Sequence, residues 1–246
     1  AAEEAKANGL IGHIGFSFHD KYPVFEQIID EYDGWEFCQI QYNFMDVDFQ
    51  AGRRGLRKAY SNQLAVIVME PLKGGQIAAA PPPQVKPIWD QLGASKRKNG
   101  HVDLALKWIW DHREVALVLS GMSTMEQLEQ NLASADEAAQ GIFPNETHIM
   151  FEQLRSMYND LRKVNCTGCG YCMPCPSGVN IPQILSIYND LYMYRDDHQP
   201  KRTYNYILDE AERADRCTEC GACEEACPQK IEIIAALKAA HQQLAK

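Results

Sequence analysis

The sequence predicts an α/β fold with a parallel sheet, followed by an all-helical module. From Leu10 to about Asn131, short apolar runs alternate with segments of helical periodicity, the pattern of parallel strands joined by helices. Beyond Asn145 the apolar residues follow helical spacing only. Eight of the nine cysteines lie in this second part, in two short blocks. We therefore expect one domain over residues 1–140 and a second over residues 145–246.

Four segments of the first part have the character of strands: residues 11–18, 37–42, 65–69 and 115–119. The third of them, AVIVM, is apolar throughout, as expected for a strand that is buried on both faces. Helices are predicted over residues 24–31, 52–62 and 102–111, and another begins near Met125 with Thr124 as its N-cap. Residues 1–8 resemble a helix that has already begun, so we expect the chain to be the C-terminal part of a longer protein.

In the second part, apolar residues at helical spacing predict helices over residues 150–164, 181–192 and 204–213, and a last one around residues 233–237. Gly141 and Pro144 mark the linker that precedes them, over residues 139–145. The long segment between Cys175 and Cys217 is helical in pattern. This indicates a helical module and not a ferredoxin built mostly of short strands.

The two cysteine blocks share a common arrangement: three cysteines separated by two residues each, then a fourth cysteine followed by proline. Gly168, Gly170 and Gly221 allow the loops to fold around a cluster. The second block has the bacterial ferredoxin spacing, in which the fourth cysteine ligates the other cluster. We therefore expect two 4Fe–4S clusters. One is held by Cys166, Cys169, Cys172 and Cys227, and the other by Cys175, Cys217, Cys220 and Cys223.

Two other uses of cysteine are possible. Paired C-x-x-C motifs also form structural zinc sites, but the third evenly spaced cysteine and the Cys-Pro in each block exceed that pattern. Disulfides would suit a small secreted protein, and nothing in the sequence indicates secretion. Only two residues separate Cys175 from Cys172, whereas three separate Cys227 from Cys223, which makes the ligand role of Cys175 the least regular of the eight. Cys38 lies in an apolar run and is expected to be a buried core thiol.

The composition is that of a folded protein, with 46% hydrophobic and 23% charged residues. The net charge of −9 argues against nucleic acid or an anionic membrane as the main partner. No apolar run has the length of a membrane span, and no signal peptide opens the chain. Cysteines that bind clusters need a reducing compartment, so we expect the protein to be cytoplasmic.

The strand segments resemble the C-terminal half of the aldo/keto reductases, in the branch that carries a C-terminal iron–sulfur domain. The matching segments are GHIGFSFHD (12–20), QIQYN (39–43), VIVMEPLKGG (66–75) and SGMSTMEQLEQN (120–131), in the order and spacing of that family. The resemblance implies strands five to eight of a (β/α)8 barrel of the TIM type. It also implies NAD(P)H as a cofactor, bound without a Rossmann motif, and a small carbonyl compound as substrate.

The resemblance further implies a nucleotide site at the C-terminal ends of the strands, where such barrels place their chemistry. Ser17 and Gln39 match residues that hold the nicotinamide carboxamide, and Met69 matches the residue that stacks on the ring. The pyrophosphate loop corresponds to Pro71, Leu72, Lys73 and Gly74, the ribose loop to Gly121, Met122 and Ser123, and the adenine end to Gln127 and Asn131. Without the family, PLKGG could equally be a tight turn, and Ser17 and Gln39 polar groups of a barrel interior.

Two departures from the family pattern affect this site. Phe18 replaces a residue that is commonly polar, which would weaken the carboxamide contact. Ser123 stands where a basic residue often recognises the 2′-phosphate, which argues against a preference for NADP. The Asp-Tyr-Lys-His tetrad of the family comes from the first four strands, which this chain does not contain, so no catalytic residue is assigned. His19 follows the first strand and is either an active-site group or a surface histidine.

Three functions are compatible with these features: an aldo/keto-reductase-like oxidoreductase with clusters that relay electrons to a redox partner, an electron-transfer protein whose barrel is a docking scaffold, and a nucleotide-sensing protein with structural clusters. Half a barrel leaves its outer strands, residues 11–18 and 115–119, with unpaired edges. We therefore expect a homo-oligomer, or association with a missing N-terminal half.

Overall fold

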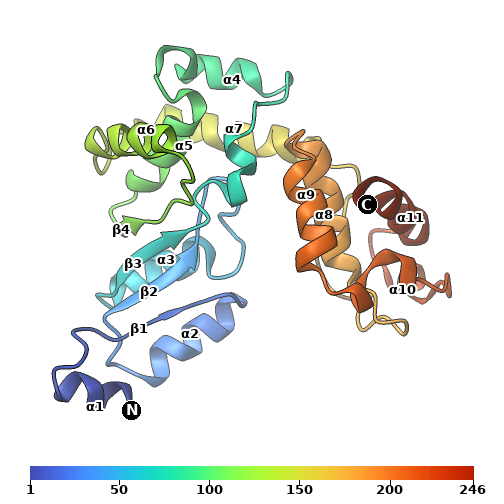
Figure 1. The fold of residues 1–246 in the computed structure, drawn as a ribbon, viewed down its shortest axis with the longest axis horizontal. Coiled ribbons are helices and arrows are strands. Elements are labelled where there is room, and N and C mark those ends of the chain that lie inside the picture. The colour runs from blue at the N-terminus through green and yellow to red at the C-terminus, as the bar shows by residue number, and fades with distance from the viewer. The chain divides into compact units, whose positions relative to one another are not determined.

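A computed structural model describes residues 1–246 and contains an α/β unit and a helical unit (Figure 1). The α/β unit comprises Ala1–Ala78 and Pro87–Arg155, and the helical unit comprises Ala79–Lys86 and Ser156–Lys246. The α/β unit contains α1 (Ala2–Ala7), β1 (Gly15–Ser17), α2 (Tyr22–Glu31), β2 (Phe37–Gln41), α3 (Gly52–Ser61), β3 (Ala65–Met69), the short turn η1 (Lys73–Ala78), η2 (Ala94–Lys96), α5 (Gly100–Trp110), β4 (Val115–Val118) and α6 (Met125–Asp136). Two helices, α4 (Lys86–Gln91) and α7 (Asn145–Asp160), cross the boundaries between the units.

The four strands form one parallel sheet in the order β1-β2-β3-β4, as the alternation of strands and helices predicts. Ser17 is paired with Gln39, and Gln39 with Ile67. The first strand is shorter than expected, because β2 begins at Phe37 and offers no partner to the residues before Gly15. Leu10 and Ile11 are accordingly exposed. The outermost strands of the sheet are β1 and β4.

The two faces of the sheet differ. Cys38, Ile40, Val66 and Val68 are fully buried on the face where α3 packs against β2 and β3. Residues of the opposite face, such as Ile67 and Met69, are only partly covered. The prediction that β3 is buried on both faces was therefore wrong, because its apolar composition does not reveal that one face lacks a covering layer. Cys38 is a core thiol, as expected, and burial raises its pKa to about 12.

An aromatic cluster forms the core beyond the C-terminal end of β2. Tyr42 stacks on Trp108 of α5 with 5.3 Å between ring centroids, and Phe44 contacts Trp89 and Phe151 at 5.6 and 5.4 Å between centroids.

Thr124 caps α6 as predicted, since its hydroxyl accepts a hydrogen bond from the Gln127 amide at 3.2 Å.

The helical unit contains no strand. Its core joins α8 (Ile181–Met193) to α11 (Ile233–Leu244), with Ile184, Leu185 and Tyr188 packed in one cluster with Leu237 and Leu244. The remaining short elements are α9 (His198–Arg202), the wide turn η3 (Thr203–Ile207), η4 (Glu210–Glu212), η5 (Ala214–Arg216) and α10 (Ala222–Ala226). None of the helices of the chain combines the length and the apolar character that a membrane crossing requires.

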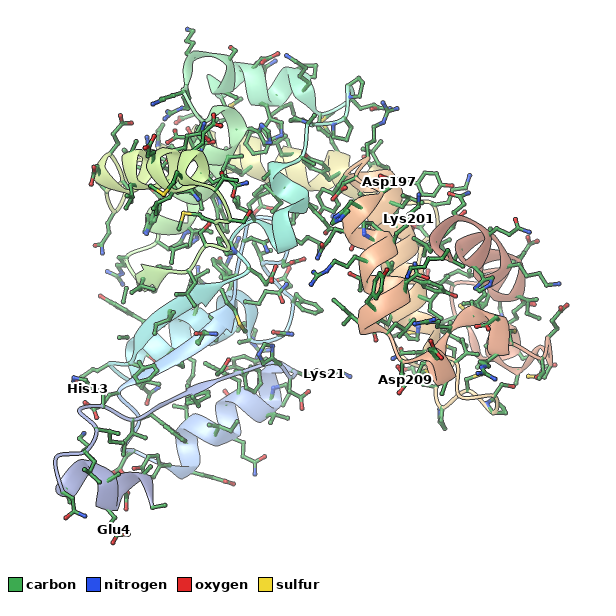
Figure 2. All side chains as sticks on the ribbon, in the orientation of Figure 1. Glu4, His13, Lys21, Asp197, Lys201 and Asp209 are labelled. Atoms are coloured by element: carbon green, nitrogen blue, oxygen red, sulfur yellow. The ribbon has the colours of Figure 1, made fainter.

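The single helix predicted over residues 204–213 was wrong. Leu208 is extended, with φ −70° and ψ 129°, and therefore ends the wide turn η3. The Asp209 carboxylate then accepts a hydrogen bond from the Ala211 amide at 2.9 Å and starts a separate short turn. In Figure 2, Asp209 lies at the lower end of the helical unit, whereas Asp197 and Lys201 lie at its upper end. The apolar spacing was compatible with a helix, but the Asp209 carboxylate takes a backbone amide hydrogen bond that a continuous helix would use.

Candidate functional site

The three residues predicted to hold the nicotinamide lie together on neighbouring strands, with Ser17 and Met69 at the C-terminal ends of β1 and β3 and Gln39 in the middle of β2. The side-chain amide of Gln39 lies 3.5 Å from the Ser17 hydroxyl and 3.4 Å from the Met69 sulfur. These side chains project from β1, β2 and β3 on the less covered face of the sheet. A hydroxyl and an amide together offer both donors and acceptors, which is what recognition of a carboxamide requires.

Two neighbours of this group were interpreted from sequence alone. Phe18 is buried and packs edge-on against Phe25 of α2, with 5.0 Å between centroids, so it points away from Ser17. The expectation that Phe18 weakens a contact with the carboxamide stays a prediction. His19 Nε2 lies 3.4 Å from Ser17 Oγ and is the only histidine with a described contact to these three residues.

The loop after β3 has a backbone suited to close approach by a ligand. Glu70, Lys73, Gly74 and Gly75 all have positive φ values, between 51° and 93°. Pro71 is buried and Leu72 is half-buried, whereas Gly74 and Gly75 are exposed. An added Cβ on Gly75 would meet no atom within 4 Å, so the space beside its backbone is open. Consecutive left-handed residues of this kind occur in loops that bind anions through backbone N–H groups.

The charge of Lys73 is already engaged, which the sequence did not reveal. Its ammonium lies 3.1 and 3.2 Å from the two Asp46 carboxylate oxygens. The same carboxylate accepts hydrogen bonds from Gln41 at 2.8 Å and Asn43 at 3.1 Å. Asp46 therefore fixes the position of Lys73 at the end of the sheet, and an anion beside this loop would share the lysine with it.

The residues predicted for the adenosine end form two small hydrogen-bonded groups. The Gln127 side-chain oxygen accepts from the Ser123 amide at 2.9 Å, and Asn131 donates to the Ser120 hydroxyl at 3.1 Å. Gly121 and Met122 are exposed in the loop between them. The second group continues to Asn99, whose amide lies 3.2 Å from Asn131 Oδ1.

Beside Asn99 lies an open cavity with a volume of about 430 Å³. Lys96, Arg97 and Lys98 line it on one side, and α6 lines it on the other. Burial alone would raise the pKa of Asp103, which also lines the cavity, but hydrogen bonds from Ser134, Lys107 and Arg97 outweigh it and lower that pKa. The basic residues were not singled out from the sequence, because consecutive lysines and arginines usually indicate only a solvated surface.

In the helical unit, four cysteines from both blocks line one small hollow. They are Cys166, Cys169, Cys172 and Cys227. Apolar side chains complete its wall, among them Ile181, Leu185 and Ile233. Burial is the main cause that raises the pKa of Cys172, and the nearby Cys166, Cys169 and Cys227 raise it further. Thiolates gathered in this way repel one another, and a cationic centre would stabilise them.

The second block repeats the backbone of the first. The amide of Gly168 donates to Cys166 Sγ at 3.4 Å, and that of Glu219 donates to Cys217 Sγ at the same distance. Gly170 and Gly221 follow with φ values of 79° and 80°. Amides that point at cysteine sulfur are among the features that tune iron–sulfur clusters, and both blocks have them.

Cys175 is brought to the second block by a contact that was not predicted. The hydroxyls of Ser177 and Thr218 lie 2.9 Å apart and join the segment after Cys175 to the segment after Cys217. Cysteines of both blocks pack against the same core, among them Cys175, Cys217 and Cys223 and also Cys166 and Cys172. All nine cysteines are free thiols, and no three His, Cys, Asp or Glu side chains are arranged to hold a single metal ion. The four sulfurs that line one hollow, and the amides that point at sulfur, fit a 4Fe–4S cluster held by Cys166, Cys169, Cys172 and Cys227. The grouping of Cys175, Cys217, Cys220 and Cys223 stays a prediction.

The profile of the aldo/keto reductase family matches residues 1–140, and that of the 4Fe–4S dicluster domain matches residues 165–232. The chain therefore belongs to the aldo/keto reductase family and carries a 4Fe–4S dicluster domain. No match to a curated protein was found.

Similar solved structures include an aldo-keto reductase from Bacillus halodurans in its holo form, with 20% identity and a TM-score of 0.48 over 62% of this chain and 53% of that one. Its apo form matches with 21% identity and a TM-score of 0.47, over 62% and 54%. An aldo-keto reductase from Klebsiella pneumoniae in complex with NADPH matches with 19% identity and a TM-score of 0.47, over 62% and 51%. The chain spans about half the length of these proteins.

Proposed function

We propose that this chain is the cofactor-binding part of an oxidoreductase that transfers a hydride between NAD(P)H and a small carbonyl compound, and that its two clusters relay single electrons to a redox partner or a second cofactor. The observation that carries the electron-transfer part is the convergence of Cys166, Cys169, Cys172 and Cys227 on one hollow. Membership of the aldo/keto reductase family supports the reductase part. The four parallel strands would then be the C-terminal half of an eight-stranded barrel.

In this proposal the strand ends orient the nicotinamide. Ser17 and Gln39 would hold the carboxamide, and Met69 would pack on the ring. The exposed backbone at Gly74 and Gly75 approaches the pyrophosphate, with Lys73 held nearby by Asp46. A bound NAD(P)H would supply the hydride to a carbonyl carbon, and the carbonyl oxygen would take a proton. The proton donor would come from the preceding half of the barrel, because the tetrad of the family has no counterpart here.

The choice between NAD and NADP rests on the cavity beside Asn99. Ser123 brings no charge to the ribose loop, which by itself argues against a 2′-phosphate. Lys96, Arg97 and Lys98 line a cavity that adjoins the Asn99–Asn131 hydrogen bond, and they supply that charge from the other side. We therefore expect NADPH to be preferred over NADH.

The cysteines define the role of the helical unit. When bound, a 4Fe–4S cluster accepts or donates one electron at a time. Cys217, Cys220, Cys223 and Cys175 would hold the second cluster, and the Ser177–Thr218 contact supports the inclusion of Cys175. Clusters of this kind persist in a reducing cytoplasm, where we place the protein.

The test combines nucleotide titration by fluorescence with an anaerobic assay against several aldehydes and ketones. We expect measurable but weak NADPH binding and negligible turnover, since proton transfer by a positioned donor contributes about 10²–10⁴-fold. Adding an N-terminal half-barrel that carries the tetrad should restore turnover. Absence of nucleotide binding in the presence of that half would refute the reductase part, and robust turnover by residues 1–246 alone would indicate another proton donor, with His19 the first to test.

The spectrum of the clusters separates this function from the alternatives. Bleaching of their visible absorbance on addition of NADPH supports the oxidoreductase. Nucleotide binding without any redox change would instead favour a sensor with structural clusters. Cluster reduction by another donor, without nucleotide binding, would favour an electron-transfer protein.

A further inference from the structure

The two cysteine blocks have the same backbone but differ at one position between their first two cysteines. The first block reads Cys166-Thr-Gly168-Cys169, and the second reads Cys217-Thr-Glu219-Cys220. The φ values of Gly168 and Glu219 are 68° and 58°, so both are left-handed. Glycine adopts this conformation readily, whereas a residue with a Cβ is disfavoured in it. The backbone conformation at position 219 therefore favours glycine. The presence of a glutamate there is not explained by local backbone structure.

Glu219 is also not explained by a contribution to stability. Its carboxylate lies 2.8 Å from the ammonium of Lys238 on α11, and both side chains are more than half exposed. Exposed ion pairs of this kind add little to stability and are screened by salt. What distinguishes Glu219 is its position, since its own amide donates to Cys217 Sγ at 3.4 Å. The carboxylate is thus carried by the residue that contacts a predicted cluster ligand.

We propose that Glu219 and Lys238 set the reduction potential of the cluster held by Cys175, Cys217, Cys220 and Cys223, so that it differs from that of the other cluster. This inference rests on the proposal that these cysteines hold a cluster. Reduction adds negative charge, which a nearby carboxylate opposes and a nearby ammonium favours. In the first block, Gly168 contributes no charge at the corresponding position. The second block therefore has a carboxylate paired with an ammonium at a position where the first block has no charge.

The test is an anaerobic redox titration followed by EPR, on Glu219→Gly, Lys238→Gln and the double variant. Glu219→Gly removes the carboxylate and should raise the potential of the second cluster, whereas Lys238→Gln leaves the carboxylate unpaired and should lower it. We expect each to change the reduction equilibrium about three- to tenfold, which is about 30–60 mV at 59 mV per tenfold for one electron. The double variant should lie above the wild type but below Glu219→Gly, because the ammonium of Lys238 offsets only part of the effect of the carboxylate. The potential of the first cluster should not move.

Lys201→Gln is the matched control, because it removes an exposed ion pair with Asp197 from the same unit, at the end away from α10 (Figure 2). It should leave both potentials unchanged. Glu219→Gly matches the first block and relieves the left-handed strain, so this variant should fold and keep its iron. Iron is counted first: a wild type with only one cluster would overturn the proposed function. Two clusters whose potentials stay unchanged, or shift in the same direction in both single variants, would overturn this inference alone.

Discussion

Substitution of Cys227 by alanine tests the exchange of ligands between the two blocks. Cys227 belongs to the second block in sequence, yet it lines the hollow of Cys166, Cys169 and Cys172 and is only 7% exposed. Its loss should therefore remove the first cluster although all four cysteines of the first block remain. The iron content should fall from about eight to about four per chain.

The assay compares the EPR spectrum and the iron and sulfide content of Cys227→Ala with those of Cys169→Ala and Cys220→Ala. The remaining signal of Cys227→Ala should match that of Cys169→Ala and not that of Cys220→Ala. Cys38→Ala is the control, because that thiol is fully buried in the α/β unit and should leave all the iron in place. Full iron in Cys227→Ala, or a spectrum like that of Cys220→Ala, would refute the assignment.

Three further predictions concern the α/β unit. The unpaired edges of β1 and β4 favour association, so residues 1–246 alone should form dimers or larger species, and a stable monomer in light scattering would contradict this. Burial lowers the pKa of His112 below its ordinary 6.5, so its neutral form contributes stability that is present above pH 6.5 and lost as the pH falls below it. His112→Asn should flatten this pH dependence in urea unfolding, and an unchanged slope would refute the assignment to His112. Lys98→Gln should weaken NADPH binding severalfold and spare NADH in a fluorescence titration; equal losses for both nucleotides would exclude a 2′-phosphate contact.

The sequence predicted the strands and most helices, because each has a strong local pattern. Parallel pairing followed from the alternation of elements, and α8 and α11 followed from their apolar spacing. The predictions failed where a side chain or a missing layer decides the outcome. Asp209 breaks the helix expected over residues 204–213 by binding its own backbone. Ile67 and Met69 are apolar although nothing in the structure fully covers their face of the sheet.

The candidate site could likewise be predicted only where a local sequence pattern determines it. The spacing of the cysteines predicted that Cys166, Cys169, Cys172 and Cys227 lie together, and these four line one hollow. The grouping of the other four stays a prediction. Contacts between distant segments were not predictable, because no local pattern reports them. The pairing of Lys73 with Asp46, the Ser177–Thr218 contact and the approach of Lys238 to Glu219 are of this kind. Two of these contacts, the ion pairs Lys73–Asp46 and Lys238–Glu219, place charge near the proposed cofactors.

The central claim, that the helical unit holds two 4Fe–4S clusters, is tested most directly by measuring iron, acid-labile sulfide and zinc together on the anaerobically purified chain. The arrangement of the eight cysteines predicts about eight irons and eight sulfides per chain, with broad visible absorbance that bleaches on reduction. Stoichiometric zinc without that absorbance would contradict the claim, because the cysteines would then be structural zinc ligands.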